Sequence, residues 1–203
     1  MMPKVSVIIP VWNQETLVIR ALDSIPRRED IEVVVVDDAS TDNTLKNVME
    51  YAERHKELPI RVFHNDVNRG LGYTKNVGYD MAVGEYVHQL DSDDYLYTDV
   101  YSRAIDQIVD EDMVFINLVV NSGSIFFLNK DTKHGYCGGT TKFTKRSFLG
   151  SHRCPEIRGG EDWYLNEELM ALPHTEKFTN LNAYHYNFPR DGSLYDLMTK
   201  GLL

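Results

Sequence analysis

Three observations predict an α/β fold for this chain of 203 residues: short β-branched apolar runs, segments of helical periodicity between them, and a change of rhythm near residue 110. The first two predict a mainly parallel sheet flanked by helices over residues 1–110. The third predicts a smaller α+β portion over residues 111–203. We expect one domain, residues 1–203, since a typical domain has about 150 residues.

The expected elements follow from local patterns. Strands are expected at residues 5–9, 31–36, 60–64 and 85–90, each nearly continuous in apolar residues, as strands covered on both faces must be. Apolar stripes at helical spacing predict helices around residues 17–25, 45–52 and 100–108. Later in the chain we expect a hairpin of strands at 113–120 and 124–128, a helix from near Glu161 to before Pro173, and a last strand at 182–188.

Charge and cysteine content argue against several classes of protein. The chain has 21 Lys and Arg against 31 Asp and Glu, a net charge of −10, which opposes adsorption to nucleic acid and implies that phosphate binding needs a cation. Cys137 and Cys154 are too few for a disulfide framework, so we expect reduced thiols. The first apolar run is too short for a signal peptide and no later run reaches membrane-spanning length, which predicts a cytoplasmic protein.

Polar and acidic residues follow each of the first four expected strands. These segments are residues 10–15, 37–42, 65–70 and 91–94. Ligands of open α/β sheets bind beyond the carboxyl ends of the strands. We therefore expect the four segments to meet at one edge of the sheet and to form the functional site.

The segment Asp91-Ser92-Asp93-Asp94 places three aspartates in four residues. Their repulsion favours a bound cation, and Mg²⁺ or Mn²⁺ takes a few carboxylate oxygens together with substrate phosphates and water. The alternative is structural, with Asp93 and Asp94 capping the next helix and Asp91 closing a turn. An isolated acidic turn favours that alternative, whereas its place among the other strand-end segments favours the metal site.

Two other acidic pairs also allow two interpretations each. Asp37 and Asp38 either support the start of the next helix or accept hydrogen bonds from a base or ribose. Glu161 and Asp162 follow a Gly-Gly pair at the start of an expected helix. Acidic residues there commonly interact with the helix dipole, but such a carboxylate is also suited to act as general base on a hydroxyl.

Four segments in register also carry a family resemblance. They are Val5-Ser6-Val7-Ile8-Ile9-Pro10-Val11-Trp12-Asn13, Val36-Asp37-Asp38-Ala39-Ser40-Thr41-Asp42, Asn68-Arg69-Gly70, and Gly84-Glu85-Tyr86 running into Leu90-Asp91-Ser92-Asp93-Asp94. Together they closely resemble the family 2 glycosyltransferases of GT-A fold over about residues 4–102, and Gly160-Glu161-Asp162-Trp163 is similar to the family's E-D motif. Four such motifs on strand ends are far more specific than one.

The resemblance implies an inverting transfer of one sugar from a nucleoside diphosphate sugar, preferably a UDP-sugar, with Mn²⁺ or Mg²⁺ as cofactor. Asp38 is similar to the base-contacting acid, and Asp162 to the general base. Asp93 is similar to the metal ligand, with Asp91 near the ribose or donor sugar and the metal, although the adjacent Asp94 leaves the ligand open by one position. The other expected donor-binding residues are Pro10, Asn13, Glu15, Asn68, Gly70, Ser92 and Lys75. For Lys75, a solvated position on a helix surface is an equal alternative.

The acceptor is expected to be a glycan, a lipid-linked saccharide or another hydroxyl compound. Since the Q-x-x-R-W motif of processive synthases is absent, addition of a single sugar is favoured over polymerisation. Glu161, Trp163 and His185 are candidate acceptor or metal contacts, although a lone histidine among aromatic residues is more often packed in a core. His88, in an expected strand, is interpreted as a core residue.

Two other classes of nucleotide- or phosphate-binding protein fit these residues less well. A sugar nucleotidyltransferase would need a glycine-rich, basic loop after the first strand, which residues 10–15 lack, and a phosphoacceptor receiver domain would need its acidic pair there. A noncatalytic nucleotide-sugar-binding module remains an alternative. Glycosylation of a modified nucleic-acid base is another, and it would need a basic surface strip formed by Lys130, Lys133, Lys142, Lys145 and Arg146.

Overall fold

The computed structural model describes residues 2–133, 138–157 and 159–189. In the first half, the elements are β1 (Val5–Val11), α1 (Leu17–Asp23), β2 (Ile31–Asp37), α2 (Thr44–Arg54), β3 (Ile60–His64), α3 (Leu71–Met81), β4 (Tyr86–Gln89), β5 (Tyr95–Leu96) and α4 (Thr98–Asp106). The second half has β6 (Met113–Val120), β7 (Ile125–Phe126), the 3₁₀ turn η1 (Gly139–Thr141), β8 (Lys142–Lys145), α5 (Arg146–Leu149), α6 (Glu161–Met170) and β9 (Glu176–Tyr186). Residues 134–137 and the tail after Pro189 fall outside the described residues.

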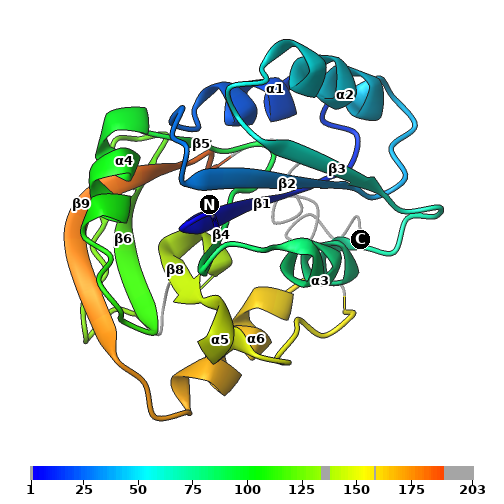
Figure 1. Cartoon of the computed structure of the whole chain (residues 1–203). Coiled ribbons are helices and arrows are strands. Elements are labelled where there is room, and N and C mark those ends of the chain that lie inside the picture. Colours follow the sequence, from blue (N-terminus) through cyan, green and yellow to red (C-terminus); the bar gives the residue numbers. More distant parts are fainter. Residues whose placement is uncertain (1, 134–137, 158, 190–203) are drawn as a thin grey trace.

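One mixed sheet runs through both halves of the described chain (Figure 1). Its order is β3-β2-β1-β4-β8-β6-β9-β5, with β7 paired to β6. Strands β1 to β4 are parallel, whereas β8 is antiparallel to β4 and β6. The expected α/β class with a smaller mixed C-terminal portion is confirmed. Because β2 and β4 flank β1 on opposite sides, the strand order reverses there, where open α/β sheets bind their ligands.

Alternate residues of the central strands feed two hydrophobic clusters. Val7 and Ile9 of β1 join the cluster that includes residues of α1, α2 and α4, while Ile8 joins the one that includes residues of α3, α5 and α6. Successive strand residues point to opposite faces, so β1 is buried along its whole length. Figure 1 shows α1 and α2 on one side of the sheet and α3, α5 and α6 on the other.

The second half differs from expectation in detail. The hairpin of β6 and β7 forms, with Gly123 at φ +83° in the turn. The last strand begins at Glu176 rather than residue 182, because its first residues pair with β6 from Met113 onwards before an irregular register near Asn117. Helix α6 begins at Glu161, as expected.

In the part of the chain that the structure describes, no helix has the length and apolar character needed to cross a membrane. Cys154 is a free, buried thiol, and Cys137 lies outside the described residues.

Candidate active site

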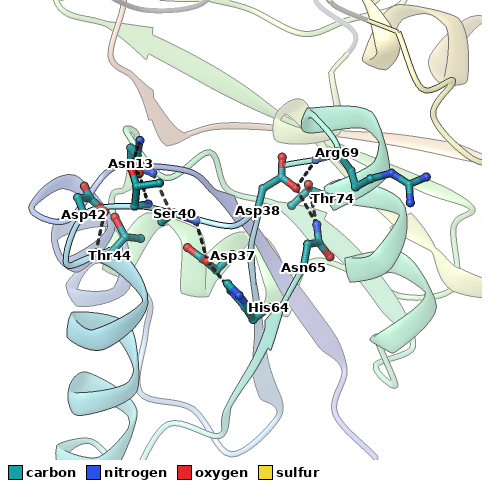
Figure 2. Close-up of polar contacts among 11 residues, drawn as sticks. Asn13, Asp37, Asp38, Ser40, Asp42, Thr44, His64, Asn65, Arg69 and Thr74 are labelled. Atoms are coloured by element: carbon teal, nitrogen blue, oxygen red, sulfur yellow. Dashed lines mark hydrogen bonds and ion pairs between the residues drawn. The ribbon is translucent and has the colours of Figure 1, made fainter. Parts of the chain in front are cut away.

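The loops after β1 and β2 are joined by Asn13, which adopts φ +50°. Its backbone N donates to Ser40 Oγ at 2.9 Å, and its Oδ1 accepts from Thr41 N at 2.8 Å (Figure 2). Asparagine tolerates this left-handed backbone better than most residues. Glu15 continues the connection, since its Oε2 accepts from the backbone and side-chain nitrogens of Asn43 at 3.1 and 3.0 Å. Pro10, by contrast, is buried within β1.

Asp38 connects the loop after β2 to the loop that begins α3. Its Oδ1 accepts from Asn65 Nδ2 at 2.8 Å and from Arg69 N at 2.9 Å (Figure 2). Its Oδ2 accepts from Gly70 N at 2.8 Å. Gly70 has φ +86°, a conformation that costs little only for glycine and that turns its N–H towards Asp38. Asn68, which precedes this pair, is exposed.

Asp37 has structural partners of its own. Its Oδ2 lies 2.8 Å from His64 Nδ1 and accepts from Ser40 N at 3.1 Å. The side chain is 1% exposed, so the structural interpretation of this acidic pair applies to Asp37 directly. Asp38 instead supports the loop before α3, because its two oxygens accept from the backbone N–H groups of Arg69 and Gly70.

The segment after β4 separates its three aspartates by environment. Asp94 is buried; its Oδ2 accepts from Tyr184 Oη at 2.6 Å and its Oδ1 from Asn187 N at 2.8 Å. Both oxygens therefore fix β9 against this loop. Asp91 and Asp93 are partly exposed, and Asp91 Oδ1 accepts from Gln89 Nε2 at 2.6 Å. Ser92 between them is nearly buried.

These carboxylates are electrostatically crowded. Burial raises the pKa of Asp91 to about 7; the Lys75 ammonium opposes this rise, and the carboxylates of Asp162 and Asp93 add to it. Burial, with Asp91 and Asp93, raises the pKa of Asp94 well above its usual range. Among the described residues, no group of three or more His, Cys, Asp or Glu is placed to hold a metal ion by itself.

Asp162 lies in the first turn of α6, where it meets a lysine from α3. Lys75 Nζ donates to Glu161 Oε1 at 2.7 Å and to Asp162 Oδ1 at 2.5 Å. The side chains of Lys75 and Glu161 are 1% and 4% exposed, whereas Asp162 retains 27%. The alternative of a solvated lysine is wrong, because α3 turns this residue towards α6. Gly160, at φ +78°, begins the helix and presents the acidic pair.

Strand β9 supplies two tyrosines of the expected last strand, to which the sequence assigned no individual role. Tyr184 Oη lies between two residues of the acidic loop. It donates to Asp94 Oδ2 and accepts from Asp91 N at 3.1 Å. Burial and the carboxylates of Asp91, Asp94, Asp93 and Asp162 all raise the pKa of Tyr186, which places its hydroxyl near the same cluster. The spacing of two residues between Tyr184 and Tyr186 could have predicted that both tyrosines lie on the same face of this strand.

His185 points to the other side of β9. Its ring stacks on Tyr95 at 4.2 Å, and its nitrogens lie 3.0 Å from Tyr97 Oη and Asn121 Oδ1. These partners fit the packed interpretation of His185 better than a contact with the carboxylates. His88 is buried between Tyr101 Oη and Thr140 O, as expected for a core residue.

Two further features surround Asp162. Trp163 is 51% exposed and packs edge-on against Tyr164 at 5.1 Å. Asp162 lines a cavity of about 20 Å³ together with Gln89 and Asn166. Gln89 Oε1 and Asn166 Nδ2 are buried without a hydrogen-bond partner among the described residues. That volume suits a single water molecule.

Three of the five basic residues expected in a nucleic-acid-binding strip are buried or paired with acidic residues. Lys142 is buried and donates to Asn166 Oδ1 at 2.7 Å. Lys133 pairs with Glu176, and Lys145 with Asp110. Lys130 and Arg146, the other two residues of the expected strip, are exposed.

Comparison with known proteins identifies the family. The model of glycosyl transferase family 2 matches residues 6–164. The chain belongs to glycosyltransferase family 2. The matched range includes the four strand-end segments and the first turn of α6, which are the parts of the chain described above.

Individual family members are similar over much of the chain. Glycosyltransferase GlyA of Streptococcus pneumoniae is 27% identical over 97% of this chain and 32% of its own length. The poly(ribitol-phosphate) β-N-acetylglucosaminyltransferase TarS of Staphylococcus aureus is 40% identical over 47% of this chain and 17% of its own. TarS 1-349 in complex with UDP-GlcNAc superposes with a TM-score of 0.81 at 25% identity, over 95% of this chain and 60% of that one.

The mannosyltransferase PcManGT of Pyrobaculum calidifontis, in complex with GDP-Man and Mn²⁺, shares the fold. It superposes with a TM-score of 0.73 at 23% identity, over 95% of this chain and 59% of that one. The first curated relatives are longer than this chain, which spans 16% to 32% of their lengths.

Proposed function

We propose that this chain transfers one sugar, with inversion, from a nucleoside diphosphate sugar to an acceptor hydroxyl in the synthesis of a cell-surface glycan. The observation that carries the proposal is Asp162: a partly exposed carboxylate, held by a buried ammonium, beside the acidic loop after β4. Family membership supplies the reaction class. A UDP-sugar is the preferred donor, by similarity to the TarS complex with UDP-GlcNAc.

Asp162 is proposed as the general base. Its ion pair with Lys75 fixes one carboxylate oxygen, and 27% exposure leaves the side chain open to an acceptor. Glu161 is almost fully buried, which suits an anchor better than an acceptor contact. In the proposed step, Asp162 takes the proton of the acceptor hydroxyl as its oxygen attacks the anomeric carbon.

The acidic loop fits a divalent cation. Burial and neighbouring negative charge hold the pKa of Asp91 at about 7, and a bound cation would relieve that crowding. Asp93 and Asp91 are the proposed ligands, because both oxygens of Asp94 already accept hydrogen bonds from Tyr184 and Asn187. When bound there with the diphosphate, Mg²⁺ or Mn²⁺ stabilises the negative charge of the leaving group.

The donor nucleotide is proposed to lie over the ends of β1 to β4. Asn13 and Glu15 form one border, and the Asp38-supported loop with Asn68 and Gly70 forms another. Asp38 is proposed as the base contact through the remaining lone pairs of its carboxylate, with Pro10 beneath and Ser92 beside the donor. Trp163 and Tyr164, exposed beside the proposed base, are suited to contact an acceptor sugar.

The experiment that tests this function measures nucleotide release and binding together. Purified protein is incubated with UDP-GlcNAc, UDP-glucose or GDP-mannose, with Mn²⁺, Mg²⁺ or EDTA, and released nucleoside diphosphate is quantified. Thermal shift with the same ligands reports binding to the folded state. We expect metal-dependent release with one donor, including slow transfer to water, and loss of release in Asp162→Asn.

The matched variants separate the assignments. Asp162→Asn is expected to reduce release by about 10²- to 10⁴-fold while keeping the thermal shift with donor. Asp93→Asn is expected to lose the metal-dependent shift, whereas Asp94→Asn is expected to lower the melting temperature. Donor binding without release by the wild type would favour the noncatalytic module instead.

A further inference from the structure

Lys75 is a buried cation with both its carboxylate partners on another helix. Its side chain is 1% exposed, and its ammonium lies 2.7 Å from Glu161 and 2.5 Å from Asp162. Burial alone would lower the pKa of Lys75, but the negative charges of Asp162, Asp91 and Glu161 raise it well above its usual value. The lysine therefore stays charged, and a buried charge of this kind is tolerated only with such partners.

Three other residues on the same face of α3 contact the segment before α6 or line the cavity beside Asp162. Asn76 Nδ2 donates to Cys154 O at 2.8 Å, and Cys154 N donates to Asn76 Oδ1 at 2.9 Å. A Cβ at Gly72 would lie 2.4 Å from Pro155 O, so the helix and this segment are in backbone contact. Tyr79 lines the small cavity beside Asp162. Positions 72, 75, 76 and 79 share one helix face.

This geometry disfavours a direct contact between Lys75 and the donor phosphates. Two of its three N–H groups are directed at carboxylates, and the side chain has almost no exposed surface. Arg69, in the preceding loop, is exposed and stacks on Tyr73 at 4.0 Å. The solvent-exposed cation near α3 described here is therefore Arg69, whereas Lys75 is buried.

Resting on the proposed function, we propose that Lys75 is a positioning residue for the general base: it fixes the carboxylate of Asp162 in the orientation needed for the acceptor hydroxyl. Glu161 completes the arrangement from beneath. Because α3 follows the donor loop at residues 69–70, whose N–H groups Asp38 holds, one helix sets the distance between the donor site and the base. Effective positioning of this kind depends on displacements of about 1 Å.

A double-mutant cycle tests the proposal with the full chain. Wild type, Lys75→Met, Asp162→Asn and the double variant are compared by nucleoside diphosphate release from the donor that the wild type uses. We expect Lys75→Met to lower kcat about 10- to 100-fold, with the KM for donor changed less than about 3-fold. In the Asp162→Asn background, we expect the same substitution to change kcat by less than about 3-fold, because Lys75 acts through Asp162.

Arg28→Met is the matched control, since Arg28 also pairs with two carboxylates but lies before β2, away from the strand ends. It is expected to keep kcat within about 2-fold. If Lys75→Met does not fold, the cycle is repeated with Glu161→Gln in all four proteins, which removes the buried partner charge along with the cation. Lys75→Arg, which retains the charge, is expected to recover part of the lost kcat.

Three results would overturn the assignment, and they are distinguishable. If Lys75→Met lowered kcat by the same factor in the wild-type and Asp162→Asn backgrounds and raised the KM for donor, Lys75 would be a donor ligand. Unchanged kcat in Lys75→Met would remove it from the reaction. No release by the wild type with any donor would overturn the proposed function itself, and the positioning role with it.

Discussion

Two cations in this protein each pair with two carboxylates, and they lie at opposite ends of the parallel strands. Arg28, just before β2, lies 2.8 Å from Asp30 and 2.8 Å from Asp106, whose side chains are 31% and 61% exposed. Lys75, near the strand carboxyl ends, pairs with Glu161 and Asp162, which are 4% and 27% exposed. The two clusters have the same charges but different access to water.

The difference in solvent access separates structural from functional electrostatics. At Arg28, water screens the charges and the cluster is nearly neutral in its effect on the fold. At Lys75, burial makes the partners depend on one another, and Asp91 adds further negative charge nearby. A site that keeps unneutralised carboxylates together at a cost to stability is suited to bind a cationic ligand or to accept a proton.

The largest expected effect is that of Lys75→Met on stability. Removing the cation leaves Glu161 buried without its partner, which costs about 3–5 kcal/mol in the free energy of unfolding. Urea denaturation followed by circular dichroism measures it. A loss below 1 kcal/mol would show that the cluster is as weakly coupled as the one at Arg28.

Gly72→Ala is expected to follow, with a loss of about 1–3 kcal/mol from overpacking. The new methyl group would lie 2.4 Å from the backbone oxygen of Pro155, so α3 and the segment before α6 must separate. The same urea titration measures the change. An unchanged or higher stability would mean that the gain in helix propensity outweighs the contact.

Arg28→Met is expected to cost at most about 1 kcal/mol, because its partners are exposed. Hydrogen bonding to Arg28 is the main cause that lowers the pKa of Asp30 below 3.8. A lowered folded-state pKa stabilises the protein above 3.8 and loses that effect as the pH falls through the lowered value. The difference between wild type and variant should therefore shrink in acid, as measured by thermal melts from neutral pH downwards.

The smallest expected effect is the loss of stability in Asp106→Asn and its dependence on salt concentration. Removing this exposed partner should cost a few tenths of a kcal/mol in dilute buffer and nothing measurable in 1 M NaCl, where the screening length is about 3 Å. Melting temperatures at both salt concentrations provide the test. The loss in Lys75→Met should persist in 1 M NaCl, and its disappearance would contradict the buried character of that cluster.

The parallel half of the fold was predictable because its strands are continuous apolar runs with polar residues at their ends. Helix α3 had no comparable signal. Its buried positions are Gly72, Thr74, Lys75, Gly78 and Tyr79. They form no apolar stripe, because the glycines allow close backbone contact without an apolar side chain and the lysine is buried as a charged group. The solvated alternative for Lys75 followed from the general exposure of lysine side chains, and no stripe in the sequence opposed it.

The acidic loops of the site were also predictable, while their partners were not. Asp91, Asp93 and Asp162 stand out as clustered charges in the sequence. The assignment of Asp94 to structure depends on Tyr184, which lies 90 residues away along the chain and is recognisable only once β9 is in register. Contacts between distant segments carry no local sequence pattern.

The reciprocal hydrogen bonds between Asn76 and Cys154 bear on how relatives could be recombined. A chimera joined near residue 110 would take α3 from one parent and the segment before α6 from the other, and would lose this match unless both parents encode it. Transplanting residues 71–81 together with the C-terminal portion would keep it. The structural unit that carries this contact is therefore discontinuous in sequence although continuous in space.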